Sequence, residues 1–135
     1  MSHAAYLRAV AAALEAAGIP VADCRADDRA PRDGWIPFDL VRQVRLHGRP
    51  VWDHDQAGLG WDEHRGWHLL TVSGRGVRTE KDLEVAAVAA PGTVVSAVAR
   101  LAGLAVPDAA EPHPDLDPAP GPAFEAALQR YAQFG

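Results

Sequence analysis

The fold is decided by one stretch of the chain, residues 57–72, which reads AGLGWDEHRGWHLLTV. Two runs that carry large apolar side chains flank a short polar segment that ends in glycine, and this is the pattern of a β-hairpin. We predict arms at residues 57–62 and 67–72, joined by a four-residue loop from Glu63 to Gly66. Gly66 would take the left-handed conformation that such loops need. The hairpin is therefore the centre of the predicted sheet.

A four-residue loop also fixes the register of the hairpin. It pairs Trp61 with His68, so Trp61 would point to one face of the sheet and Trp67 to the other. The Trp67 face would also carry Leu69, with room left beside both side chains by two glycines in the facing arm. A sheet that is apolar on both faces needs two covers, either two helices or a helix and a partner.

The rest of the chain predicts an α+β fold with a single antiparallel sheet of about four to five strands. An N-terminal and a C-terminal helix would flank the sheet, and a short helix would end the chain. Helices are expected at about residues 3–17, 92–102 and 123–134, and further strands at 21–26, 35–40 and 83–89. Pro37 removes a ladder donor, which favours an edge position for its strand, whereas the run 83–89 is apolar on both faces and is expected to be central.

Two segments are treated separately from the predicted elements. Residues 41–49 fit a helix or a strand, and we take them as a strand extension and loop. Residues 106–122 contain six prolines among acidic residues, which is typical of an extended, semi-rigid linker. The sequence thus divides into an α+β domain at 1–105, a linker at 106–122 and an amphipathic tail at 123–135.

The composition indicates a cellular compartment and excludes some classes of partner. The chain has 135 residues, a net charge of −5 and one cysteine, Cys24. A single cysteine allows no intramolecular disulfide, which suits a reducing compartment, so we expect a cytoplasmic protein. No apolar run is long enough to span a membrane, and an acidic chain makes nucleic acid an unlikely partner.

The hairpin resembles that of a small actinobacterial family known only as a domain of unknown function. The resemblance is carried by residues 58–67, GLGWDEHRGW, with the Trp-Asp-Glu-x-x-Gly-Trp pattern, and by the strand and Pro-started helix at 83–101. It covers about residues 3–104 and leaves out the tail. It implies a fold, but no activity and no catalytic residues.

The sequence offers no arrangement that predicts catalysis or metal binding. Asp62 and Glu63 are adjacent, so their side chains diverge, unlike a facing pair of catalytic carboxylates. His64 and His68 lie on a loop tip and a strand rather than one turn apart on a helix, and no second cysteine is present for a structural zinc site. We therefore expect no catalytic residues, no metal and no cofactor, and an enzyme is the less favoured reading.

The favoured function is a non-enzymatic protein-interaction or regulatory module. Its partner would be another protein or a second copy of the chain, held by the Trp67 face, by the tail helix, or by both, since large aromatic side chains are favoured at interfaces. The predicted partner-binding residues are Trp67, Leu69, Phe124, Leu128, Tyr131 and Phe134. In the alternative reading the tail packs on its own domain.

A second hypothesis is a small-molecule or anion-binding protein, possibly an enzyme. Its pocket would be lined by Trp35, Trp52, His54, His68, Arg42, Arg45 and Arg75. The candidate anion-binding residues are Arg42, Arg45, Arg49, Arg75 and Arg78. Such arginines lie in two loops of an otherwise acidic chain, where they could equally be solvated.

Overall fold

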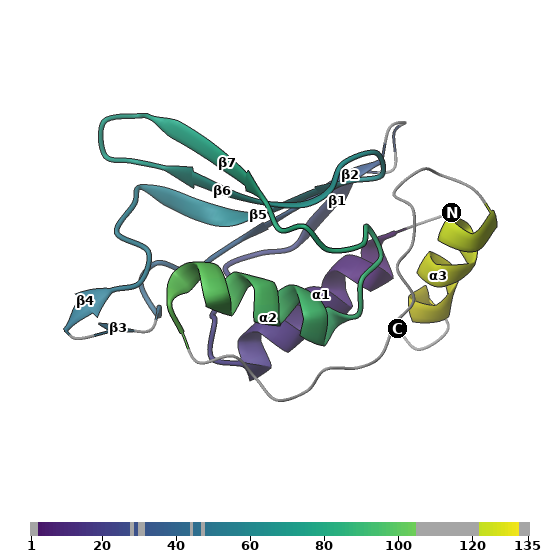
Figure 1. The fold of residues 1–135 in the computed structure, drawn as a ribbon, viewed down its shortest axis with the longest axis horizontal. Helices are drawn as coiled ribbons and strands as arrows, with labels where there is room; N and C mark the ends of the chain where they lie inside the picture. Colours follow the sequence, from purple (N-terminus) through teal and green to yellow (C-terminus); the bar gives the residue numbers. More distant parts are fainter. Residues whose placement is uncertain are drawn as a thin grey trace.

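The described part of the protein folds as a five-stranded antiparallel sheet, a short two-stranded ribbon and three helices (Figure 1). The structure is a computed structural model, which describes residues 3–27, 29, 32–43, 45–46, 48–104 and 122–132. The strands are β1 (Arg25–Asp27), β2 (Asp33–Pro37), β3 (Arg45–Leu46), β4 (Arg49–Pro50), β5 (Gln56–Asp62), β6 (Gly66–Val72) and β7 (Arg78–Asp82). The helices are α1 (Ala4–Ala16), α2 (Pro91–Ala102) and α3 (Pro122–Ala132).

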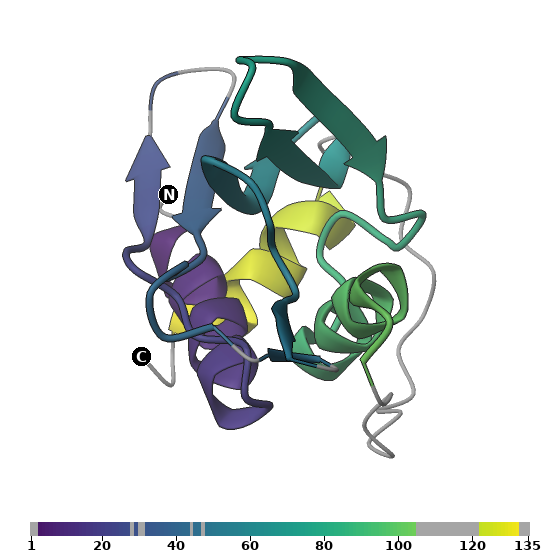
Figure 2. The ribbon, with the colours of Figure 1, turned by 90° about the vertical axis from the view of Figure 1, so that its left-hand side faces the viewer.

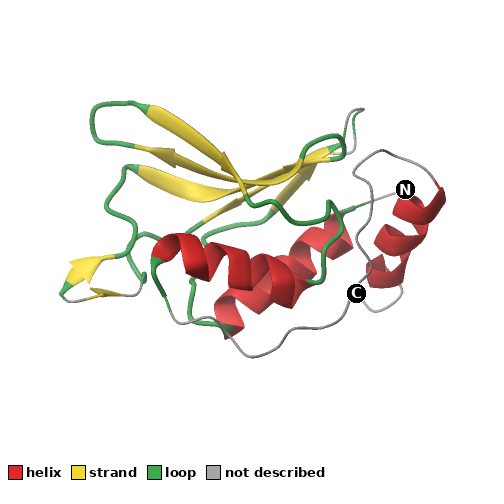
Figure 3. Ribbon diagram, viewed as in Figure 1, coloured by secondary structure: helices red, strands yellow, loops and turns green. Residues whose placement is uncertain are grey.

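Five strands form one sheet in the order β1-β2-β5-β6-β7, and each neighbouring pair is antiparallel. The short strands β3 and β4 form a separate two-stranded ribbon, so the described residues of 41–49 are turn and strand, but they do not extend β2 as expected. All three helices lie on the same side of the sheet (Figures 1 and 3). The predicted α+β class, with one antiparallel sheet flanked by N-terminal and C-terminal helices, is confirmed.

The hairpin is present, but its predicted register is wrong by one residue. Asp62 pairs with Gly66, and Trp61 pairs with Trp67, so the loop has three residues rather than four. Gly66 has a φ of 76°, the left-handed conformation expected of it, but it begins β6 instead of ending the loop. A left-handed glycine closes three-residue and four-residue hairpin loops alike, so the glycine did not distinguish them.

The corrected register puts both tryptophans on the face that the helices cover. Trp61 and Trp67 are each 1% exposed, and Leu69 is 9% exposed. Tyr6 of α1 packs edge-on against both indoles, with ring centroids 6.4 Å and 5.9 Å away. The expectation that Trp67 and Leu69 lie on the face opposite Trp61 is therefore wrong, because a shift of one residue in the register moves a side chain to the other face.

The apolar run at 83–89 is a buried loop, not the central strand that its composition predicts. Glu84 has a φ of 58°, which breaks an extended conformation, yet Leu83 and Ala89 are buried. Side chains satisfy the loop carbonyls: Trp61 Nε1 donates to the Ala87 oxygen at 2.7 Å, and the Tyr6 hydroxyl donates to the Ala89 oxygen at 2.5 Å. These bonds replace the ladder that a buried backbone otherwise needs.

The strand that contains Pro37 is interior, so the expected edge position is also wrong. β2 lies between β1 and β5, and Pro37 is its last residue, paired with Gly58. The pairing of β2 with β1 stops at Trp35, so the missing N–H of Pro37 interrupts no bond to β1. The charged strand β7, with all five residues exposed, occupies one edge of the sheet instead.

The helices begin and end near their predicted positions. α2 has Pro91 in its first turn. It is followed by Gly103 with a φ of 74°, the left-handed conformation expected of a glycine that ends a helix. α3 begins at Pro122, the last residue of the predicted linker, and ends at Ala132, whereas residues 106–121 of that linker and Phe134 lie outside the described residues. The division into a domain of residues 1–105, a linker and a tail stays a prediction, but α3 itself packs against α1 (Figure 2).

Candidate binding face

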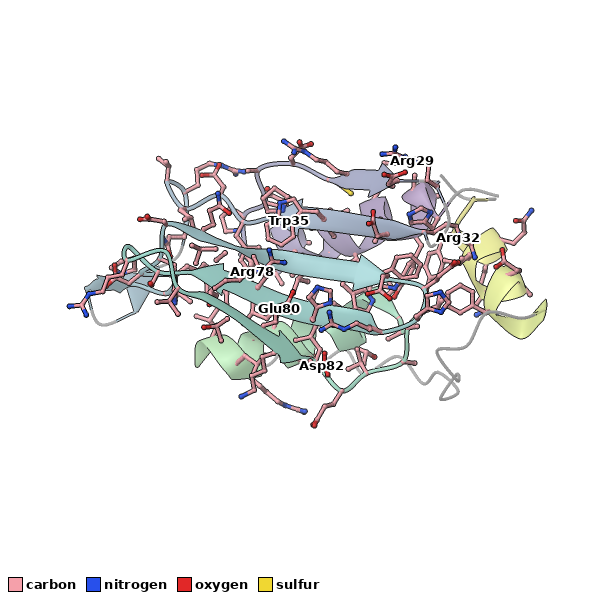
Figure 4. All side chains as sticks on the ribbon, turned by 90° about the horizontal axis from the view of Figure 1, so that it is seen from above. Arg29, Arg32, Trp35, Arg78, Glu80 and Asp82 are labelled. Atoms are coloured by element: carbon pink, nitrogen blue, oxygen red, sulfur yellow. The ribbon has the colours of Figure 1, made fainter. Side chains whose placement is uncertain are left out.

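The face of the sheet that points away from the helices is the candidate functional surface, here called the outer face. Strand alternation assigns its residues, because Ile36 of β2 and Leu59 of β5 are fully buried on the helix side. The outer face carries Asp33, Trp35, Gly58, Gly60, His68, Leu70, Arg78, Glu80 and Asp82. Figure 4 views this side of the sheet and shows Trp35, Arg78, Glu80 and Asp82 along it.

Two glycines of β5 let two aromatic rings lie close to the backbone. A Cβ atom at Gly58 would lie 2.7 Å from Cη2 of Trp35, closer than real contacts allow. A Cβ atom at Gly60 would collide with the imidazole of His68. The glycines therefore determine the positions of Trp35 and His68, which cover strand positions that have no side chain of their own.

The outer face is hollowed, with a volume of about 750 Å³. The hollow extends across β1, β2, β5, β6 and β7, with half-buried Trp35 and buried His68 among its lining residues. Its charged lining residues are Arg25, Asp27, Arg29, Asp33, Asp62, Arg65, Arg78 and Glu80. The lining thus combines one large, accessible aromatic side chain with charges of both signs.

Each of the four arginines that line the hollow lies next to a carboxylate. The ion pairs are Arg25–Asp23 at 2.9 Å, Arg29–Asp27 at 3.0 Å, Arg78–Glu80 at 3.2 Å and Arg65–Asp82 at 3.5 Å. The hydrogen bond from Arg78, together with the nearby positive charges, lowers the pKa of the Glu80 carboxyl and keeps it ionised at neutral pH. The charges of this surface are therefore largely balanced by their own neighbours.

His68 is the buried polar group of the outer face, with 8% of its surface exposed. Its Nε2 atom lies 3.9 Å from Oε1 of Glu80, which is too long for a direct hydrogen bond. Its Nδ1 atom is buried and has no hydrogen-bond partner among the described residues. Across that part of the chain, no three His, Cys, Asp or Glu side chains are grouped so that they could hold a metal ion.

The predicted anion-binding residues whose side chains are described, Arg42, Arg75 and Arg78, do not gather in one pocket. Arg42 pairs with Glu15 at 2.9 Å and with Asp39 at 2.8 Å, on the α1 side of the chain. Arg75 lies in the turn between β6 and β7, and Arg78 lines the outer face. Nothing is described for the side chains of the other two, Arg45 and Arg49.

The aromatic and histidine residues of the same predicted pocket separate in the same way. Trp52 is 6% exposed and stacks on Phe38 with ring centroids 4.9 Å apart. His54 is half-buried in the segment before β5. Only Trp35 and His68 of this group line the hollow.

The tail residues predicted for partner binding pack on the chain's own domain. Phe124 and Leu128 are 2% and 3% exposed, and Phe124 stacks on Trp61 with ring centroids 6.1 Å apart. Tyr131 contacts Tyr6 at a centroid distance of 4.9 Å. The alternative reading, in which the tail docks on its own domain, therefore describes this structure.

An ion-pair cluster beside the tail helix was missed by the sequence analysis. Arg32 donates to Glu63 in the hairpin loop at 2.7 Å and to both carboxylate oxygens of Glu125 on α3. Its guanidinium carbon also lies 5.7 Å from the ring centre of Phe124. No local pattern joins these residues, because Arg32 and Glu125 are 93 positions apart.

One group of charged residues on the outer face could have been found from the sequence. As a strand, the segment RTEKD places Arg78, Glu80 and Asp82 on one face, with Thr79 and Lys81 on the other. The strand was instead predicted in the apolar run at 83–89, which directly follows β7. The structure thus defines an α+β domain with helices on one side of its sheet and a hollowed, charged face on the other.

The chain belongs to a family of unknown function, DUF6292, whose model matches residues 6–100. This match confirms the expected family resemblance and leaves out α3. Searches of curated proteins and of solved structures gave no significant match. No helix of the described residues is long and apolar enough to cross a membrane.

Proposed function

We propose that the protein is a non-enzymatic interaction module that binds a segment of another protein on the outer face of its sheet. The observation that carries the proposal is the position of Trp35, a half-buried indole in a hollow bordered by charges of both signs. Protein interfaces combine such aromatic anchors with a polar rim, and tryptophan is enriched among the residues that dominate binding energy.

The charge arrangement favours a polypeptide over a free anion or a nucleic acid. The arginines of the hollow are already paired with carboxylates, so a phosphate group would have to displace Asp27 or Glu80 before it gained a cation. A polypeptide can pair with charges of both signs and can place an apolar side chain on Trp35. The open shape of the hollow fits an extended segment or a loop.

Within this proposal, the charged residues that line the hollow contact the partner and carry out no reaction. We also propose a location in the cytoplasm, because the chain has a single cysteine. The family resemblance of the hairpin further suggests an actinobacterial source.

The proposal is tested by quantitative affinity enrichment with the wild-type chain, Trp35→Ala and Val41→Ala. Val41 is 94% exposed and lies outside the hollow, which makes it a matched control for loss of a surface apolar side chain. We expect a partner that the wild type and Val41→Ala retain and Trp35→Ala loses. The purified partner should bind Trp35→Ala at least about tenfold more weakly in calorimetry, the loss of about 1.4 kcal/mol or more that hot-spot residues show. Equal enrichment by all three chains would contradict the proposal.

A second candidate, small-molecule binding, is favoured by the buried Nδ1 of His68. The volume of about 750 Å³ falls within the range of ligand pockets, and an unpartnered imidazole nitrogen could bond to a polar ligand. A thermal-shift screen with nucleotides, sugar phosphates and divalent metals tests it. A compound that stabilises the wild type but not His68→Leu would favour this second function over the first.

A further inference from the structure

The site that receives α3 belongs to a different part of the molecule from the outer face. Trp61 of β5 and Tyr6 of α1 form its aromatic floor, against which Phe124 and Tyr131 pack. Arg32, whose side chain is 12% exposed, forms its charged end. Tyr6, Arg32 and Trp61 all lie within the family match at residues 6–100, whereas α3 lies outside it. The shared family unit therefore supplies the receiving site, and the tail supplies the helix.

The fit between the site and the helix is specific in chemistry. Phe124 stacks on Trp61 at an interplanar angle of 17°, and the next residue, Glu125, binds Arg32 through both carboxylate oxygens. Leu128, one helical turn after Phe124, is 3% exposed. An aromatic residue, a neighbouring glutamate and a leucine one turn later thus define the helix that this site recognises.

The helix has little stability apart from the site. α3 has 11 residues, which is too short for a stable isolated helix in water. Nineteen residues, 103–121, connect it to α2, and five of them are proline. The end of α2 and the helix α3 lie on opposite sides of the molecule (Figure 1). A connection of this length, in a composition that favours extension at about 3.1 Å per residue, can span about 60 Å, which is enough to reach a neighbouring chain.

We propose that α3 of one copy of this chain also occupies the receiving site of a second copy, which gives a helix-exchanged dimer. Each site in such a dimer keeps the same contacts with Trp61 and Arg32 as in the monomer, so exchange costs no side-chain interactions. The balance between the two forms depends on protein concentration relative to the effective concentration of the tethered helix. This proposal is independent of the partner proposed for the outer face.

Exchange is tested with cysteines placed at Glu63 and Glu125 in a Cys24→Ser background. Both carboxylates bind the guanidinium of Arg32, which lies between them, so a short bismaleimide cross-linker that spans one guanidinium joins cysteines at these positions where α3 is docked. Chains with Glu63→Cys alone and Glu125→Cys alone are mixed and treated with the cross-linker. We expect a mixed cross-linked dimer that exceeds the dimer formed by either chain by itself. An intramolecular cross-link in the double variant, with no mixed dimer between single variants, would overturn the proposal.

Sedimentation velocity of the full chain over a range of concentrations gives an independent test without new cysteines. We expect a dimer that increases with concentration, that is lost in the Phe124→Ala, Leu128→Ala double variant and that persists in Trp35→Ala. Circular dichroism shows whether each variant is folded. A monomer at every concentration contradicts the exchange, and so does a dimer that only Trp35→Ala removes, because that dimer would use the outer face.

Discussion

The indole N–H of Trp67 donates to the hydroxyl oxygen of Tyr6 at 3.0 Å, and that hydroxyl donates in turn to the Ala89 carbonyl at 2.5 Å. One hydroxyl thus joins the sheet, helix α1 and the buried loop before α2. The burial of Tyr6, which has no exposed surface, raises the pKa of its phenol well above the ordinary value. The hydroxyl is therefore neutral at physiological pH, and it remains available as a donor.

Tyr6→Phe should destabilise the protein although it removes a single oxygen atom. The substitution leaves the Trp67 N–H and the Ala89 carbonyl buried without this partner, which costs about 1–3 kcal/mol. Urea unfolding measures the loss. In a double-mutant cycle with Trp67→Phe, the two effects should be less than additive because both remove the same hydrogen bond. Strict additivity would show that the bond contributes nothing.

Trp61→Ala should be one of the most damaging substitutions in the chain. The indole stacks with Phe124 and His3 and donates to the Ala87 carbonyl. Truncation of a buried tryptophan costs about 3–5 kcal/mol. The matched control is Trp35→Ala, which should cost distinctly less because Trp35 is half-buried. Similar losses in thermal unfolding for the two variants would contradict this burial assignment.

Glu63 should make stability depend on pH below neutrality. Burial alone would raise the pKa of its carboxyl, but the hydrogen bonds and charge of Arg32 outweigh burial and hold the pKa below the ordinary value of 4.5. The unfolded chain therefore takes up its proton first as pH falls. The stabilisation is complete above about pH 5 and is lost as pH falls through 4.5 toward the lowered value.

The measurement for Glu63 is the melting temperature from pH 3 to pH 7, compared between the wild type and Glu63→Gln. Other carboxylates with lowered pKa values, such as Glu80, act equally in both chains, so the difference isolates Glu63. The melting temperature of Glu63→Gln should fall less steeply than that of the wild type below pH 5. Parallel curves would mean that Arg32 does not hold this carboxylate in solution.

Gly58→Ala should strain the sheet. Its Cβ atom would lie 2.6 Å from the Ile36 carbonyl oxygen and 2.7 Å from the Trp35 ring, and the backbone atom cannot move aside cheaply. Overpacking of this kind costs about 1–3 kcal/mol. Gly74→Ala is the control, because its nearest neighbour would be 3.9 Å away. Chemical denaturation should show a change within about 0.5 kcal/mol for the control.

The elements with local signals could be predicted from the sequence. Pro91 and Gly103 indicate helix α2, and two apolar arms around a polar segment that ends in Gly66 indicate the hairpin. The register could not be predicted, because three-residue and four-residue loops use a left-handed glycine in the same way. A difference of one residue in loop length decides whether Trp67 lies on the outer face or in the core.

The remaining errors have one cause, which is tertiary packing that local patterns do not report. Residues 83–89 have the composition of a central strand, but their carbonyls are satisfied by Trp61 and Tyr6 from distant elements. The outer face was not found because Gly58 and Gly60 suggested space for a partner, whereas the rings of Trp35 and His68 fill that space from neighbouring strands.

The bond between Arg32 and Glu125 has a consequence for the order of folding. It joins residues 93 positions apart, so its loop-closure entropy is recovered only after the chain between them has collapsed. We expect the hairpin to form early and α3 to dock last, as the least protected cooperative unit of the described chain. Native-state hydrogen exchange should therefore show the amides of α3 opening at lower free energy than those of β5 and β6.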